Sequence, residues 1–373
     1  MRAGGSGAGV QGPGAGGQGP GTGGQGSGAG RHGAGAKLSR RSVAPALIGI
    51  LASACGRYAD FTLQAVSGGD PNLTFTLEGQ PDPVLTRGNG WDSHDVLNPS
   101  VLRDANARPA LLNLYSGFDG RTWHTGLATS PDGLHWTKVR KVLSPNAQTW
   151  EADYIAANGA AVWYTGQVWY WYVAGLRDRP RIGLMRVQGH KEPMPVLEPG
   201  PYASWDEYGV ADPYVIRIEP YFYMYYLGQD RALRQRLGVA RSKDGVRWEK
   251  LRSNPILELG ADGAFDEAAL GEPAVWNSHG FYWMLYTGSD PGRIRRLGLA
   301  RSTDGVRWKK LPLVFHGAAG WDSKVICDPA VLLEDGVIRV WFGGGDVASP
   351  DENLHGQIGY GVLRPVNDNQ GLR

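Results

Sequence analysis

The stretch that decides the fold is FDEAALGEPAV at residues 265–275, because its pattern recurs along the chain. Each copy begins with an aromatic residue followed by an acid, and seven positions after the aromatic residue it carries a polar residue followed by Pro. The other clear copies are WDSHDVLNPSV at 91–101, WDEYGVADPYV at 205–215 and WDSKVICDPAV at 321–331, and a degenerate copy runs from Trp150-Glu151 to Asn158-Gly159. The copies start 55 to 60 residues apart, and such a period is typical of propellers and other repeat arrays.

The remainder of each repeat predicts short strands. After the turn comes an aromatic and β-branched run that ends in Gly, such as Tyr221 to Gly228. A third element at 126–130, echoed at 238–242 and 298–302, leads into Asp-Gly, which favours a hairpin because both central residues of a type I′ turn need positive φ. A fourth element carries Pro195-Val196-Leu197 or Pro255-Ile256-Leu257. Four strands in each of five repeats predict an all-β fold, a five-bladed β-propeller of four-stranded antiparallel blades.

The ends of the ring are predicted to close on each other. Residues 75–85 contain Pro83-Val84-Leu85, which matches the fourth-strand motif although it precedes the first blade. The last repeat ends near residues 360–364 without a fourth strand of its own. We therefore expect residues 75–85 to supply the outer strand of the last blade, which leaves fewer exposed strand edges.

The region before the repeats has a different composition. Residues 1–36 are almost entirely Gly, Ala, Ser, Gln and Pro, which predicts a disordered leader. Residues 37–55 have the order of a secretory signal, with basic residues, a short apolar run and a lipobox-like end at Cys55. We expect a linker at 56–74 and the propeller at 75–373. The predicted location is therefore outside the cytoplasm, as a lipoprotein anchored through Cys55 or as a periplasmic or extracellular protein.

Charge and cysteine content exclude several classes of function. Residues 1–55 hold five basic residues and no acid, which turns the formal net charge of +2 for the whole chain into −3 for the remainder. That remainder shows no basic patch for nucleic acid. No zinc-binding spacing is visible, and the predicted carboxylates are compatible with a Ca²⁺ ion without requiring one. We expect no cofactor, a carbohydrate partner, membrane contact only through the lipid anchor, and a monomer.

The polar residue before each Pro changes from copy to copy, as Asn98, Asp212, Glu272 and Asp328. The first strand of each propeller blade lines the central channel, so these side chains should converge at one end of it. Carboxylates that face each other repel, and one of them should keep its proton near neutral pH. A carboxylic acid beside a carboxylate is the arrangement that cleaves glycosidic bonds.

These motifs resemble the five-bladed glycosidases of glycoside hydrolase families 43 and 32, the arabinanase, xylosidase, levansucrase and invertase type. The resemblance covers residues from about 80 to 365. It implies that Glu272 is the general acid and that Asp212 orients it or stabilises the transition state. The family's first-blade Asp, which is the base or the nucleophile, corresponds to Asn98.

An amide cannot take a proton from water or attack a sugar carbon, so Asn98 leaves three alternatives. Asp95, or less favourably Asp92 or Asp328, activates the water of a hydrolase. Phosphate attacks instead, as in the related phosphorylases of glycoside hydrolase family 130. Otherwise the protein binds glycans at the cell surface without cleaving them. The leading prediction is a glycoside hydrolase with Glu272, Asp212 and Asp95 as catalytic residues.

The remaining predicted substrate contacts are Asn98, Asp328, Asp92, Trp91 and His94. A structural alternative stands beside Asp92, because an acid follows the aromatic residue in every copy. Such repetition also favours turn capping through bonds from the carboxylate to backbone N–H groups.

Overall fold

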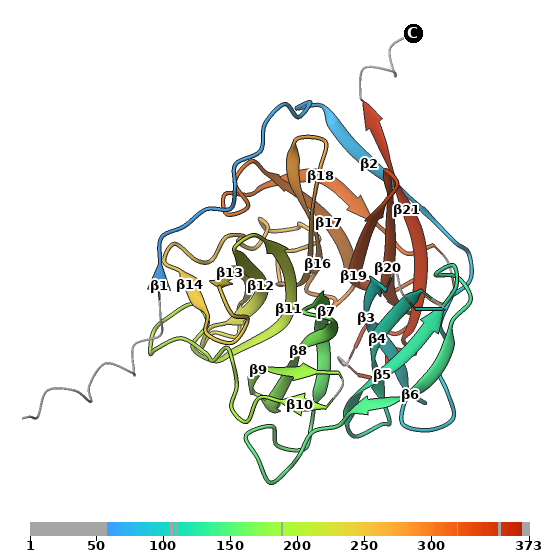
Figure 1. Cartoon of the computed structure of the whole chain (residues 1–373). Coiled ribbons are helices and arrows are strands. Elements are labelled where there is room, and N and C mark those ends of the chain that lie inside the picture. Colours follow the sequence, from blue (N-terminus) through green and yellow to red (C-terminus); the bar gives the residue numbers. More distant parts are fainter. Residues whose placement is uncertain are drawn as a thin grey trace, which may run out of the picture. The chain divides into compact units, whose positions relative to one another are not determined.

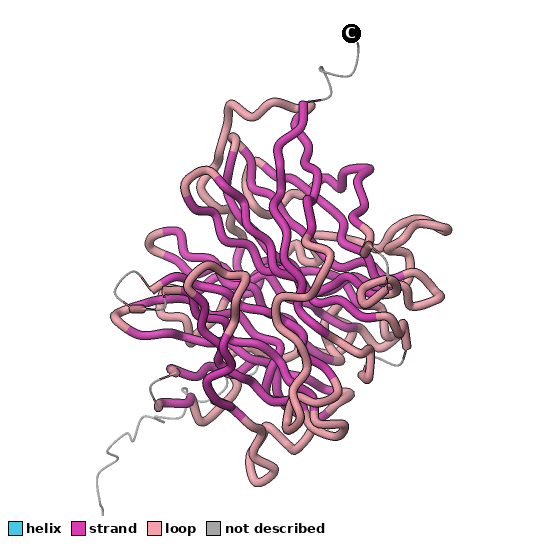
Figure 2. The backbone as a smooth tube through the Cα atoms, turned by 90° about the vertical axis from the view of Figure 1, so that its right-hand side faces the viewer, coloured by secondary structure: helices cyan, strands magenta, loops and turns pink. Residues whose placement is uncertain are grey.

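The computed structural model describes residues 58–367, apart from 105–106, 109, 188, 319 and 350–351. The predicted leader, the signal segment and the lipidation site at Cys55 lie outside these residues. The described chain consists of strands joined by loops (Figure 2), and it contains no helix long and apolar enough to cross a membrane.

The strands form five blades around a central axis (Figure 1), as the repeat predicts. The first four blades each take their strands consecutively from the sequence. Blade 1 comprises β3 (Asp95–Arg103), β4 (Leu111–Phe118), β5 (Trp123–Ser130) and β6 (Thr137–Leu143); blade 2, β7 (Ala156–Tyr164), β8 (Gln167–Leu176), β9 (Arg179–Arg186) and β10 (His190–Lys191); blade 3, β11 (Gly209–Ile218), β12 (Tyr221–Gln229), β13 (Gln235–Ser242) and β14 (Glu249–Leu251); blade 4, β15 (Ala269–Ser278), β16 (Phe281–Ser289), β17 (Arg295–Ser302) and β18 (Lys309–Phe315).

Blade 5 closes the ring with a strand from the start of the domain. Its first three strands are β19 (Val325–Glu334), β20 (Val337–Gly345) and β21 (Gln357–Asn367), and its outer strand is β2 (Leu73–Gly79). β2 pairs antiparallel with β21 over its whole length (Figure 1), which confirms the predicted closure.

Residues 58–72, which belong to the predicted linker, pack against the outer parts of blades 3 and 4. β1 (Tyr58–Ala59) adds a short parallel strand beside β14. Leu63 is buried, and its backbone N–H donates to the carbonyl of Asp304 in the Asp-Gly turn of blade 4. This segment therefore connects the edges of three successive blades before β2 completes the ring.

The fourth strands of blades 2 and 3 differ from the prediction. They are β10 and β14, while the Pro-Val-Leu and Pro-Ile-Leu motifs make only isolated bridges, Ile182 to Leu197 and Leu237 to Leu257. Because Pro has no N–H to donate, a motif that starts with Pro pairs less continuously than the preceding residues of β10 and β14.

The acid after each aromatic residue holds its blade together in blades 1 to 4. Its carboxylate accepts hydrogen bonds from a Tyr hydroxyl of the second strand and from a Lys ammonium of the fourth strand. These clamps are Asp92 with Tyr115 and Lys138, Glu151 with Tyr172 and Lys191, Asp206 with Tyr226 and Lys250, and Asp266 with Tyr286 and Lys310. Blade 5 places Phe342 at the Tyr position, and the buried Oδ1 of Asp322 has no hydrogen-bond partner among the described residues.

Candidate active site

All five first strands share one irregularity, and it builds the site. At the polar residue before the Pro, or before Gly159 in blade 2, the pairing of the first strand with the second skips two residues. The polar residue adopts a left-handed backbone, with φ of 47° at Asn98, 49° at Asn158, 46° at Asp212, 44° at Glu272 and 50° at Asp328. The bulge turns these five side chains toward the central channel.

This conformation partly explains the residue types. Asn and Asp tolerate the left-handed region better than other residues with a side chain, because their short polar side chains bond locally. Glu272 has no such advantage, yet it occupies the same conformation in blade 4. Strained residues of this kind cluster at functional sites. Among the five turn residues, Glu272 is therefore the one that the left-handed backbone does not favour, which points to a role for its longer side chain.

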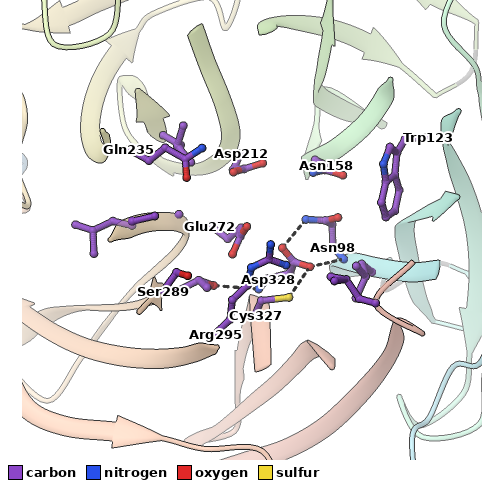
Figure 3. Close-up of a pocket in the computed structure, with 17 residues that line it drawn as sticks. Asn98, Trp123, Asn158, Asp212, Gln235, Glu272, Ser289, Arg295, Cys327 and Asp328 are labelled. Atoms are coloured by element: carbon purple, nitrogen blue, oxygen red, sulfur yellow. Dashed lines mark hydrogen bonds between the residues drawn. The ribbon is translucent and has the colours of Figure 1, made fainter. Parts of the chain in front are cut away.

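A cavity of about 190 Å³ opens above these turns. Its polar lining includes Asn98, Asn158, Asp212, Glu272 and Asp328, one residue from each blade (Figure 3). Below them the channel narrows to a space of about 40 Å³ lined by the turn prolines and Tyr214. The predicted convergence of the polar residues at one end of the channel is therefore what the structure shows.

Asp328 is held by three hydrogen bonds to its carboxyl group. It is 6% exposed. Its Oδ1 accepts a hydrogen bond from Asn98 Nδ2 at 2.6 Å, and its Oδ2 accepts from the Asn98 backbone N–H at 3.2 Å and from Cys327 Sγ at 3.1 Å. Burial and the neighbouring charge of Glu272 raise the pKa of Asp328 well above its usual range.

Glu272 faces Asp328 across a short gap. A carboxylate oxygen of each residue and the Cys327 sulfur all lie within 4.8 Å of one another, and in the described part of the chain these three side chains are the group whose donors are close enough to hold a metal ion. Oε2 of Glu272 is buried without a hydrogen-bond partner among the described residues. Burial also raises the pKa of the Cys327 thiol, which favours its protonated form.

Asp212 completes the acidic group in blade 3. A β-carbon placed on Gly271, the residue before Glu272, would lie 3.8 Å from Asp212 Oδ2. The charge of Asp212 also contributes to the raised pKa of Asp328. Three carboxyl groups from three successive blades therefore interact within one cavity, and Asp328 keeps its proton to a higher pH than an isolated Asp.

Asp95, the predicted base, does not line this cavity. Its side chain is fully buried, and its two oxygens accept hydrogen bonds from the backbone N–H groups of Asn353 and Gly356 at 2.6 and 2.7 Å. Burial raises the pKa of Asp95, and these two hydrogen bonds oppose the rise. Asp95 thus fixes the loop between β20 and β21, whose Leu354 forms part of the cavity wall.

The other three predicted contacts also lie outside the cavity lining. Trp91 stacks on Tyr115 in blade 1 with ring centroids 5.6 Å apart. Asp92 belongs to the clamp of the same blade. His94 bonds to Ser93 and packs edge-on against Phe118.

Among the lining residues that the sequence prediction lacks, three come from third strands: Trp123, Gln235 and Arg295. Each is the first residue of a third strand, three positions before the Gly that repeats at 126, 238 and 298. The residue type at this position changes from repeat to repeat while the Gly after it stays the same. The same kind of variation identified the turn residues, so it could also have identified these three lining residues. Trp123 offers an apolar ring and Arg295 a positive charge on opposite parts of the wall (Figure 3).

Fold and site together define the class of five-bladed propellers with an acidic centre. Within this class the chain belongs to a glycosyl hydrolase family: residues 114–327 match the family 32 N-terminal domain. Uncharacterized proteins from two strains of Mycobacterium tuberculosis are 29% identical over 232 residues, which cover 56% of this chain and 75% of each relative.

Solved structures share the fold at low sequence identity. One described as a glycoside hydrolase superposes with a TM-score of 0.62 at 20% identity, covering 78% of this chain and 93% of that one. A thermostable family-43 glycoside hydrolase gives 0.55 at 15% identity, with 75% and 90% coverage. The family 32 β-fructofuranosidase of Bombyx mori gives 0.55 at 15% identity, with 80% of this chain and 63% of that one covered.

Proposed function

We propose that the protein hydrolyses a glycosidic bond in an oligo- or polysaccharide, with Glu272 as the general acid. The observation that carries the proposal is the meeting of Glu272, Asp212 and Asp328 around one solvent-open cavity. Carboxyl groups in such a cluster divide into protonated and ionised members, and glycosidic cleavage needs one of each.

The remaining wall suits a sugar ring. Trp123 presents an aromatic surface, and Phe118 stacks behind it with centroids 4.8 Å apart, which keeps the indole in place. Asn158, Gln235 and Ser289 add polar groups that can bond hydroxyls. An apolar wall with a few convergent polar groups is the usual form of a small-molecule site.

The proposal is tested by incubating the purified protein with aryl glycosides and oligosaccharides of arabinose, xylose, fructose, galactose and mannose. We expect release of one sugar and a fall in turnover of about 10³-fold or more in Glu272→Gln. Equal inactivity of both proteins on every substrate contradicts hydrolysis. If they then still bind an oligosaccharide in calorimetry, the non-catalytic glycan-binding alternative, which Asn98 favours, takes its place.

Phosphorolysis is the second candidate, and Arg295 favours it. This guanidinium is the positively charged group among the residues that line the cavity. A phosphorylase would use it to hold the attacking phosphate dianion. Addition of inorganic phosphate should then convert the released sugar into a sugar phosphate, and an unchanged product in phosphate excludes this alternative.

We also propose that the protein is exported and lipid-anchored at Cys55. The support is the order of basic residues, apolar run and Cys at 37–55. The protein should incorporate an alkyne-labelled fatty acid in a bacterial host and sediment with membranes, and Cys55→Ser should lose the label. Equal labelling of both proteins, or of neither, contradicts the anchor.

A further inference from the structure

We propose that Asp328, from the fifth blade, is the nucleophilic carboxylate of this site, and that Asn98 has become the residue that orients it. The inference rests on the proposed function and specifies its mechanism. It implies a covalent glycosyl-enzyme intermediate on Asp328 and net retention of the anomeric configuration.

The first observation is that blade 1 has an amide, and the neighbouring blade 5 a carboxyl group, at the same repeat position. Asn98 and Asp328 occupy the same repeat position, share the same left-handed backbone and are joined by two hydrogen bonds. Asn98 cannot act as a nucleophile, but its amide and its backbone N–H each donate to one oxygen of Asp328. The carboxyl group that blade 1 lacks is thus supplied by blade 5, at the side of the cavity next to Asn98 (Figure 3).

The second observation is the distance to the acid. The nearest oxygens of Glu272 and Asp328 lie within 4.8 Å. Inverting glycosidases separate their carboxyl groups by roughly 6.5–9.5 Å to hold a water between them, whereas retaining enzymes separate them by about 5–5.5 Å. An oxygen-to-oxygen distance of at most 4.8 Å lies below the inverting range and next to the retaining range, which favours direct attack by a carboxylate on the sugar carbon.

The third observation is how firmly Asp328 is positioned. Its backbone N–H donates to Thr287 Oγ1 at 3.3 Å, and Cys327 Sγ adds a third donor to the carboxylate. A β-carbon on Gly343 would lie 2.8 Å from Asp328 Oδ2, so the absence of a side chain there leaves space for the carboxylate. The reaction needs the form of the pair in which the single proton is on Glu272. The three donors to Asp328 favour that form, against the burial that raises the pKa of Asp328.

The reaction then balances in two steps. Glu272 gives its proton to the glycosidic oxygen, the bond from that oxygen to the anomeric carbon breaks, and an Asp328 oxygen forms an ester bond to the same carbon. In the second step water attacks the anomeric carbon from the face of the departed alcohol and gives a proton to Glu272. The ester bond breaks, and Asp328 recovers its charge.

Asp95 is the competing candidate, and its position argues against it. Both of its oxygens bond to backbone N–H groups of the loop between β20 and β21, and it does not reach the cavity. Its role is to position Leu354 and the wall around it. Loss of Asp95 is therefore expected to weaken substrate binding more than it slows the chemical step.

The wild-type enzyme provides the first test. Proton NMR of the first product from the best aryl glycoside should show the same anomer as the substrate before mutarotation. A product of opposite configuration overturns the inference while hydrolysis itself stands. Absence of any product instead contradicts the proposed function, so that the two failures are distinguishable.

Chemical rescue provides the second test. Asp328→Ala should lower kcat by about 10³-fold or more. Azide should restore turnover by attacking the anomeric carbon directly, which gives a glycosyl azide of opposite configuration. In Asp95→Ala azide should have no effect on kcat, and the main change should be in KM. Rescue of Asp95→Ala but not of Asp328→Ala overturns the inference.

Folding is checked by thermal unfolding and by binding of the sugar product in calorimetry. If Asp328→Ala does not fold, a 2-fluoro aryl glycoside on the wild-type protein replaces it. Mass spectrometry of the digested protein should then place the trapped sugar on the peptide that contains Asp328. A sugar on any other peptide contradicts the assignment.

Discussion

Each blade carries two polar positions, six residues apart in blades 1, 3, 4 and 5 and seven apart in blade 2, and they behave in opposite ways. The clamp acid after the aromatic residue is buried and, in blades 1 to 4, paired with a Tyr and a Lys. The turn residue at the centre varies in type and meets the turn residues of other blades. The comparison shows that a residue type repeated in every blade has a structural role within the blade. A residue type that varies at a repeated backbone position belongs to the candidate active site.

Blade 5 departs from the pattern at both positions. Its clamp acid, Asp322, faces Phe342 instead of a Tyr, and burial raises its pKa. Its turn acid, Asp328, is the one that another blade's turn residue holds. The blade that closes the ring thus lacks the Tyr part of the clamp, and its turn acid is bonded to the turn residue of blade 1.

The largest expected effect comes from breaking a buried clamp. In blade 3 the side chains of Lys250 and Asp206 are 5% and 0% exposed. Lys250→Met removes the ammonium partner of Asp206 in the interior, which should cost about 3–5 kcal/mol of unfolding free energy in urea titration. Lys138→Met in blade 1, where the Lys side chain is 30% exposed, should cost less. Equal losses would mean that burial does not set the strength of the clamp.

An intermediate effect is expected from crowding the nucleophile. Gly343→Ala places a β-carbon against Asp328 Oδ2 and should displace that carboxylate. We expect a fall in kcat of roughly 10²-fold, because small misplacements of reacting groups are costly. Gly79→Ala is the control, since its β-carbon would meet only the Tyr360 carbonyl oxygen at 4.0 Å. Unchanged turnover in Gly343→Ala would contradict the claim that the missing side chain of Gly343 is needed to position the Asp328 carboxylate.

A smaller effect is expected from repairing the fifth clamp. Phe342→Tyr should place a hydroxyl against Asp322, as Tyr286 does for Asp266 at 3.1 Å. The two rings have similar surroundings at their tips. A β-carbon on Gly298 would lie 2.4 Å from Cζ of Tyr286, and a β-carbon on Gly359 would lie 2.5 Å from Cζ of Phe342. One new hydrogen bond should add about 1 kcal/mol to the unfolding free energy. A loss of stability shows that blade 5 does not accept the clamp geometry of blade 4.

The smallest effect concerns pH. Because the pKa of Asp322 is raised in the folded protein, its ionisation opposes folding. Protonated Asp322 therefore stabilises the folded protein relative to ionised Asp322. This contribution is fully present below the pKa that Asp322 has in the unfolded chain, and it is lost as pH rises through the higher pKa of the folded protein. Asp322→Asn should therefore be more stable than wild type at neutral pH and equal to it in acid. A destabilised variant at neutral pH shows that Asp322 has a partner that its amide cannot replace.

The repeat predicted the fold because five copies of one pattern repeat the same local chemistry. Varying residues at one repeat position predicted Glu272, Asp212 and Asp328 for the same reason. Asp95 could not be placed in this way, since its partners lie about 260 residues away in a loop without a repeat pattern. Trp123, Gln235 and Arg295 follow the same rule as the turn residues and could have been found by comparing third strands.

The most direct test compares the two acids of blade 4, Asp266 and Glu272, in one protein background. Glu272→Gln should abolish turnover of the best glycoside and leave the unfolding free energy nearly unchanged. Asp266→Asn should weaken the bond to Lys310, lower the unfolding free energy and leave turnover per folded molecule close to wild type. The opposite pattern, with stability lost in Glu272→Gln and turnover lost in Asp266→Asn, would contradict the division between supporting and reacting acids.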